Sequence, residues 1–259
     1  MRPSPLFSKI ETGTQTYDNV NRATYLGIGV KTIILLLITI ASAIITAIYI
    51  NYLALNIETL TDTQVVGLVA AVIVASLLSL ICGIVGRFSD RLAIGCSIIY
   101  SVSEGLLLGL LTGILEMIVP HIGVLSVFGT LIIFAIMLFL FLTGVVKAGN
   151  TLKAILLGSI LGAFSLSLFS IIYLFASGLM GTFNDSTYIL LIIGVEFLLL
   201  IFGVVSLTFN FIEASCCVSN GASKSAEWRV ALGLEVSLIY IYIRLLRIIL
   251  YISQFVRRN

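Results

Sequence analysis

Charged residues are scarce in this 259-residue sequence, since Asp, Glu, Lys and Arg together make up 10% of it. About a quarter of the residues in an average soluble domain are charged, so the composition excludes an ordinary soluble protein. Hydrophobic residues account for 60% of the chain, and the mean hydropathy is +1.21. There are only three prolines and little alternation of polar and apolar residues, which favours membrane-spanning helices over a β-barrel.

Residues that bind metals or serve as nucleophiles are also few. The single histidine, His121, follows Pro120 in an expected loop. The four cysteines have no CxxC spacing and no neighbouring histidine; they are Cys82, Cys96, Cys216 and Cys217. No GxSxG, Walker-type or HExxH motif is present, and the last apolar run has no lysine for a retinal Schiff base. We therefore expect no metal site, no cofactor and no enzymatic activity.

Seven apolar runs are each about long enough to cross a bilayer as a helix. They cover Tyr25–Tyr52, Val65–Val85, Leu92–Val119, Val124–Val146, Leu152–Ser177, Tyr188–Ile212 and Trp228–Val256. A polar segment, residues 1–24, precedes them. The sequence thus predicts a polar N-terminal tail over 1–24 and an all-α, seven-transmembrane-helix bundle over 25–259.

Lysine and arginine lie in the tail and in alternate loops, which predicts a cytoplasmic N-terminus. They are Arg2, Lys9 and Arg22, then Arg87 and Arg91, Lys147 and Lys153, and Lys224 and Arg229. Arg257 and Arg258 break this pattern. Either the C-terminal end is an exception to it, or the last segment does not cross the membrane completely.

The third run contains a surface of small residues. Gly105, Gly109 and Gly113 recur every four residues, a spacing that lets neighbouring helices approach closely. Glu104 lies near the middle of the same run, where a carboxylate is costly and usually faces the interior of a bundle. We expect this helix to be a centre of packing.

Polar stripes mark the last two runs. One face of the helix expected from the sixth run carries Glu196, Gly203, Ser206, Asn210 and Glu213. One face of the last helix carries Ser237, Tyr240, Arg244 and Arg247, and a different face of the same helix carries Glu235 and Tyr242.

These polar residues have two interpretations. In the first, the carboxyls are protonated or paired with arginine, and they fix the register in which neighbouring helices pack. In the second, they line a path for a proton or cation. Burial and a neighbouring carboxylate both favour the neutral form of a carboxyl, so such a group could act as a pH-dependent gate. Arg244 and Arg247 either supply a counter-charge or extend to the interface.

Four stretches carry a family resemblance. They are SVSEGLLLG (101–109), GTLIIFAIMLFLFLTGVVK (129–147), SLTFNFIE (206–213) and EWRVALGLEVSLIYIYIRLLRIILY (227–251). In this order, the chain resembles the Bax inhibitor family of small seven-helix membrane proteins, and most closely its bacterial Bax inhibitor-1-like branch. The resemblance implies two-helix layers around a central final helix, in a bacterial inner membrane with the N-terminus in the cytoplasm.

The resemblance also implies a pH-sensitive calcium leak. In characterised members, an aspartate late in the sixth helix and another in the seventh form the gate. Here the corresponding positions hold Thr208 or Asn210, and Ser237. Glu213 and Glu235 lie close by and could replace the pair. Our hypothesis is that these two share a proton and a hydrogen bond until deprotonation opens the path.

In this hypothesis Glu104 is a third ionisable group and Arg244 or Arg247 is the counter-charge. The alternative is a non-conducting interaction protein, whose tail modulates a membrane-bound ATP-dependent protease or a stress response. A solute transporter is disfavoured, because neither repeated halves nor broken helices are evident. Expected partners are the lipid bilayer, Ca²⁺ or H⁺, and under the alternative a membrane protein. No nucleic-acid partner is expected.

Overall fold

The computed structural model describes residues 22–55, 62–89, 91–143, 150–180 and 185–258. These residues form helices α2 (Tyr25–Leu55), α3 (Asp62–Phe88), α4 (Ala93–Glu116), α5 (Ile122–Leu142), α6 (Asn150–Met180), α7 (Asp185–Ser219) and α8 (Ala226–Arg258). Each helix contains a stretch long and apolar enough to cross a membrane. The predicted seven-helix membrane fold is confirmed.

Two tight turns depend on residues with positive φ. His121 adopts φ 64° between α4 and α5, and its N–H donates to the Glu116 carboxylate at 3.2 Å. Gly221 follows α7 with φ 62°, a conformation that glycine adopts readily at the end of a helix. Its neighbour Ala222 donates back to the Cys217 carbonyl at 3.0 Å, which closes the turn into α8.

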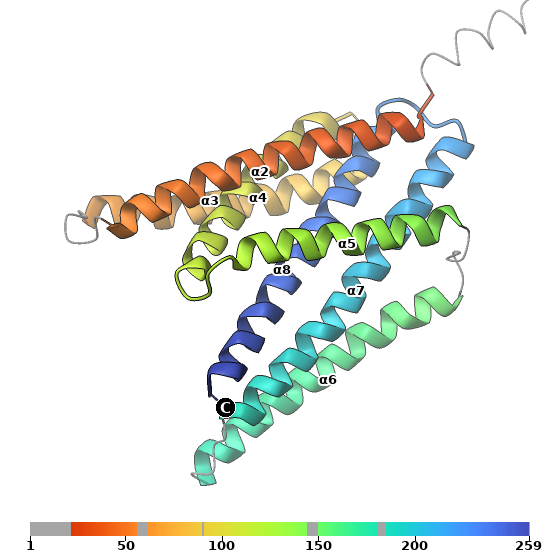
Figure 1. Ribbon diagram of the computed structural model, residues 1–259. Helices are drawn as coiled ribbons and strands as arrows, with labels where there is room; N and C mark the ends of the chain where they lie inside the picture. Colours follow the sequence, from red (N-terminus) through yellow and green to blue (C-terminus); the bar gives the residue numbers. More distant parts are fainter. Residues whose placement is uncertain (1–21, 56–61, 90, 144–149, 181–184, 259) are drawn as a thin grey trace, which may run out of the picture.

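Helix α8 lies at the centre of the bundle and packs against α2, α3, α4, α5 and α7, whereas α6 lies outside α7 (Figure 1). This arrangement agrees with the central final helix that the family resemblance implies. Helix α8 also runs the length of the bundle. Near its end, Arg257 donates to the carbonyl of Ile118, just beyond α4, at 3.3 Å.

The outer faces of the helices are strongly apolar. Exposed side chains include Leu26, Ile45, Phe164 and Phe175, which are between 67% and 80% exposed. Such a surface is suited to contact with lipid acyl chains rather than with water.

Two glycines bring α4 into backbone contact with α2. A Cβ added to Gly105 would lie 2.5 Å from the Thr39 carbonyl oxygen, and one added to Gly109 would lie 2.8 Å from Thr46 Cβ. The contact loosens at Gly113, where an added Cβ would meet Ile50 Cγ2 at 3.4 Å. Close approach therefore depends on Gly105 and Gly109 in particular.

We predict that Gly105→Ala destabilises the protein by about 1–3 kcal/mol, because overpacking a filled interface forces the backbones apart. Gly95→Ala is the matched control on the same helix, since an added Cβ there meets nothing within 4 Å. That change should be neutral, or stabilising by up to about 1 kcal/mol through helix propensity. Unfolding of the detergent-solubilised variants measures both effects, and equal shifts would contradict the prediction.

Candidate functional site

The polar stripes of α7 and α8 face each other. The Asn210 side chain donates to Ser237 Oγ at 2.6 Å and to the Gly233 carbonyl at 2.9 Å. One turn away, the hydroxyls of Ser206 and Ser237 lie 3.3 Å apart. Asn210 and Ser237 are both almost fully buried. The positions at which the resemblance implies a gating pair are therefore joined by a neutral hydrogen bond.

An arginine from α3 closes one end of this interface. Arg87 Nη2 donates to Asn210 Oδ1 at 2.7 Å and to Glu213 Oε2 at 3.4 Å. The other carboxylate oxygen of Glu213 lies 3.7 Å from Arg229 Nε. Glu213 is thus held between two guanidinium groups, with 35% of its side chain exposed.

A second ion-pair cluster lies further along the α7–α8 interface. Glu196, whose side chain is 6% exposed, accepts from Arg244 at 2.9 Å and from Arg247 at 3.3 Å. The Arg244 guanidinium also lies over the Tyr240 ring, 4.6 Å from its centroid. The structure corrects the expected counter-charge, because both arginines pair with Glu196 rather than with one of the three candidate carboxylates.

Glu235 projects from the other side of α8, towards α2 and α4. It is completely buried, and its Oε1 accepts from Thr39 Oγ1 and Ser101 Oγ, each at 2.7 Å. Its Oε2 has no hydrogen-bond partner. The expected hydrogen bond between Glu235 and Glu213 is absent from the structure, since Glu213 pairs with Arg87 of α3 and Arg229 of α8.

Glu104 lies one turn beyond Ser101 on α4 and is half-buried. It accepts from Ser79 Oγ of α3 at 2.7 Å and is near enough to Glu235 to interact with it electrostatically. Within the described ranges, hydroxyl groups are the hydrogen-bond partners of both carboxyls, and no basic side chain pairs with either.

Thr208, the remaining candidate, is buried, and its hydroxyl donates to the Val204 carbonyl of its own helix at 3.1 Å. It contributes nothing to the contacts between helices described above. The candidates therefore separate into an Asn210–Ser237 group with Glu213 at its end, and a Glu104–Glu235 group on the opposite side of α8.

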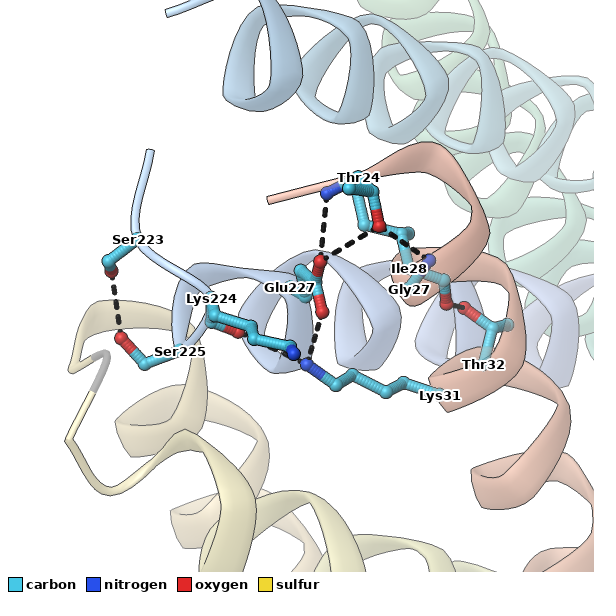
Figure 2. A network of polar contacts seen from close by, with 9 residues as sticks. All are labelled: Thr24, Gly27, Ile28, Lys31, Thr32, Ser223, Lys224, Ser225 and Glu227. Carbon is cyan, nitrogen blue, oxygen red and sulfur yellow. Dashed lines mark hydrogen bonds and ion pairs between the residues drawn. The ribbon is translucent and has the colours of Figure 1, made fainter. Parts of the chain in front are cut away.

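Another polar cluster, which we call the Glu227 cluster, consists of Thr24, Lys31, Lys224 and Glu227 (Figure 2). Glu227 is completely buried at the start of α8. It accepts from the Thr24 backbone N–H at 2.8 Å and forms an ion pair with Lys31 of α2. Lys31 also donates to the Lys224 carbonyl at 3.1 Å. These contacts hold the beginning of α2 against the α7–α8 turn.

Backbone contacts support the same junction. Ala23 N–H donates to the Ala222 carbonyl at 2.8 Å, and Arg22 and Ser223 form an isolated β-bridge. The Lys31 ammonium lies 5.2 Å from the centre of the Trp228 ring. The patterns considered in the sequence did not identify the Lys31–Glu227 pair. One available signal was the isolated lysine within an apolar run, because a membrane-embedded charge requires a partner.

In the described part of the chain, seven apolar helices with a partly polar interior define a multi-pass membrane protein. A family model described as Bax inhibitor 1 like matches residues 4–254, nearly the whole chain. The chain therefore belongs to the Bax inhibitor 1 like family, as the resemblance implied. Searches of curated proteins and of solved structures gave no match.

We predict that Lys31→Met and Glu227→Gln are each destabilising, by roughly 3–5 kcal/mol, because either change leaves a buried partner uncompensated. The double variant should lose much less than the sum of the two. A double-mutant cycle on unfolding in detergent measures this coupling. Lys153→Met is the control, since Lys153 is exposed on α6 and its change should stay within about 0.5 kcal/mol. Strictly additive losses would contradict the prediction.

Proposed function

We propose that this membrane protein is a non-enzymatic, pH-sensitive leak for calcium or another cation. The observation that carries the proposal is the difference between two kinds of carboxylate within the helical bundle. Glu196, Glu213 and Glu227 are ion-paired, whereas Glu104 and Glu235 accept from hydroxyls. Ionisable groups inside a membrane are costly, and they commonly mark ion or proton paths.

The chemistry of the Glu104–Glu235 group supports a cation rather than an anion. Two carboxyls and the hydroxyls of Ser79, Thr39 and Ser101 provide oxygen atoms, the ligands that Ca²⁺ prefers. The α7–α8 interface is less favourable, because Arg87 places a positive charge at its end. We therefore assign the path to the side of α8 that faces α2 and α4.

The gating mechanism follows from charge repulsion. When the carboxyls are protonated, α8 packs against α2 and α4 without a net charge at the contact. When both Glu104 and Glu235 ionise, like charges in a low-dielectric interior repel one another. Water and cations then stabilise a separated arrangement of α8, and the path opens as the pH rises.

We place the protein in a bacterial inner membrane, with the α7–α8 turn facing the cytoplasm. Arg87, Lys224 and Arg229 lie near this end of the bundle, and Arg91 follows Arg87 in the α3–α4 connection. An excess of basic residues favours the cytoplasmic side. The beginning of α2, and with it the N-terminal segment, would then also be cytoplasmic.

A second candidate is a non-conducting interaction protein that modulates a membrane-bound ATP-dependent protease. The Glu227 cluster favours it, because this cluster fixes the point at which the chain before Arg22 meets the bundle. Residues 1–21 lie outside the described part of the chain. In this candidate, the N-terminal segment makes the contact with the partner.

For the leak, we predict calcium flux into liposomes that is greater at about pH 8 than at about pH 6, values that bracket the titration of a buried carboxyl. Glu235→Gln should abolish the pH dependence, because the amide cannot ionise. Glu213→Gln is the comparison, since Glu213 is ion-paired and partly exposed, and it should keep the dependence. Flux no greater than that of empty liposomes would refute the leak.

For the second candidate, we predict the effect of deleting residues 1–18. If the protein is a leak, the deletion leaves flux and its pH dependence intact, because the bundle carries the path. If the protein is an interaction module, the deletion abolishes binding to the protease. Co-purification from membranes and flux measured on one preparation of the deletion variant distinguish the two.

A further inference from the structure

The surroundings of Glu235 are formed by the close contact between α2 and α4. Thr39 and Ser101 donate to Glu235 from these two helices, and Gly105, one turn after Ser101, lies against the Thr39 backbone. Both hydroxyl donors therefore lie where α2 and α4 pack most closely.

Each of these hydroxyls has a single proton and at least two acceptors, and Thr39 Oγ1 also lies 3.3 Å from the Ser101 carbonyl of α4. Thr39 Oγ1 lies 2.7 Å from Glu235 Oε1 and 3.1 Å from the Leu35 carbonyl. Ser101 Oγ lies 2.7 Å from the same Oε1 and 2.9 Å from the Ser97 carbonyl. Each hydroxyl can donate either to the carboxyl of α8 or to a carbonyl of its own helix.

Two hydrogen-bond arrangements therefore fit one set of heavy-atom positions. With Glu235 ionised, both hydroxyls donate to Oε1. With Glu235 protonated on Oε1, the carboxyl donates to one hydroxyl, which turns its proton to the carbonyl one turn earlier in its own helix. Neither arrangement requires α2 or α4 to move.

The unpartnered Oε2 distinguishes the energies of these two arrangements. When Glu235 is ionised, Oε2 has lost its hydrogen bonds to water and has no donor in the protein to replace them, which costs free energy. The same loss costs much less when the carboxyl is neutral. Ionisation in this packing is therefore costly, and a ligand such as water or a cation that reaches Oε2 would lower the cost.

The other ionisable groups near Glu235 are Glu104 and Tyr100 of α4, both of which interact with it electrostatically. Helix α2 presents the neutral Thr39. Arg87 of α3 approaches α8 at Gly233, where it contacts Asn210 and Glu213 of α7. Of Glu104 and Tyr100, half-buried Glu104 is the one whose carboxylate can take up a proton that leaves Glu235.

We propose that Glu235 binds an exchangeable proton, and that the hydroxyl of Thr39 or of Ser101 changes its acceptor as the proton comes and goes. Binding forms an O–H bond on the carboxyl, and release passes the proton to Glu104 or water. Proton binding at Glu235 does not depend on the proposed leak; only the control of flux by this proton rests on the proposed function. It also locates the pH-sensitive contact between α8 and the α2–α4 pair, not between α7 and α8.

The test is an infrared pH titration of the full-length protein in lipid, following the C=O stretch of a protonated carboxyl. We expect a band that disappears as the pH rises and that is missing in Glu235→Gln. Glu116→Gln is the matched control, since Glu116 is an exposed carboxylate at the end of α4, and this variant should keep the band. A titrating band that Glu235→Gln leaves unchanged would overturn the proposal.

Thr39→Val tests the hydroxyl exchange and retains the titrating group. Loss of a donor to the ionised form should move the disappearance of the band upwards by about 1–2 pH units, the equivalent of one hydrogen bond to a charged group. An unchanged midpoint would overturn the exchange. Flux measured on the same samples separates the two proposals: a titrating Glu235 without flux refutes only the leak, and flux without the band refutes only the proton site.

Discussion

A helix buried in a bilayer has no water to satisfy its polar side chains, so each one needs a partner in its own helix or on a neighbouring helix. Helix α8 carries polar groups on two of its faces. Asn210 of α7 meets Ser237 on one face, and Thr39 of α2 with Ser101 of α4 meets Glu235 on the other. Helix α8 is thus fixed by polar contacts on both sides, although most of the surrounding bundle is apolar.

These contacts define the register of α8 more sharply than apolar packing could. Moving one residue along a helix shifts a side chain by about 1.5 Å and rotates it by about 100°. A slip would remove Glu227 from Lys31 and Glu235 from its hydroxyls at the same time. Setting the register of α8 is therefore enough to explain why the ion-paired carboxylates are buried. It explains the burial of Glu235 less completely, because one of its oxygens has no partner.

Periodicity in the sequence was sufficient to predict the helices, and it identified the stripes that meet at the α7–α8 interface. It also placed Ser237 and Glu235 on different faces, because two residues correspond to about 200° of rotation. The expected pairing of Glu213 with Glu235 overlooked that rotation and relied on their nearness along the helices. The Lys31–Glu227 pair is different. Its members are 196 residues apart, so no local spacing indicates that they meet.

Family membership and the structure together limit what can be transferred from relatives. The resemblance associates pH sensing with acidic side chains between the last two helices. In this chain the same interface contains the neutral Asn210–Ser237 hydrogen bond, with Arg87 attached to it. A neutral amide and hydroxyl do not titrate over the physiological range. Glu235, two residues before Ser237, faces the α2–α4 pair instead. If this chain responds to pH in the way that we propose, the change in charge acts on the opposite face of α8, and α8 separates from the α2–α4 pair.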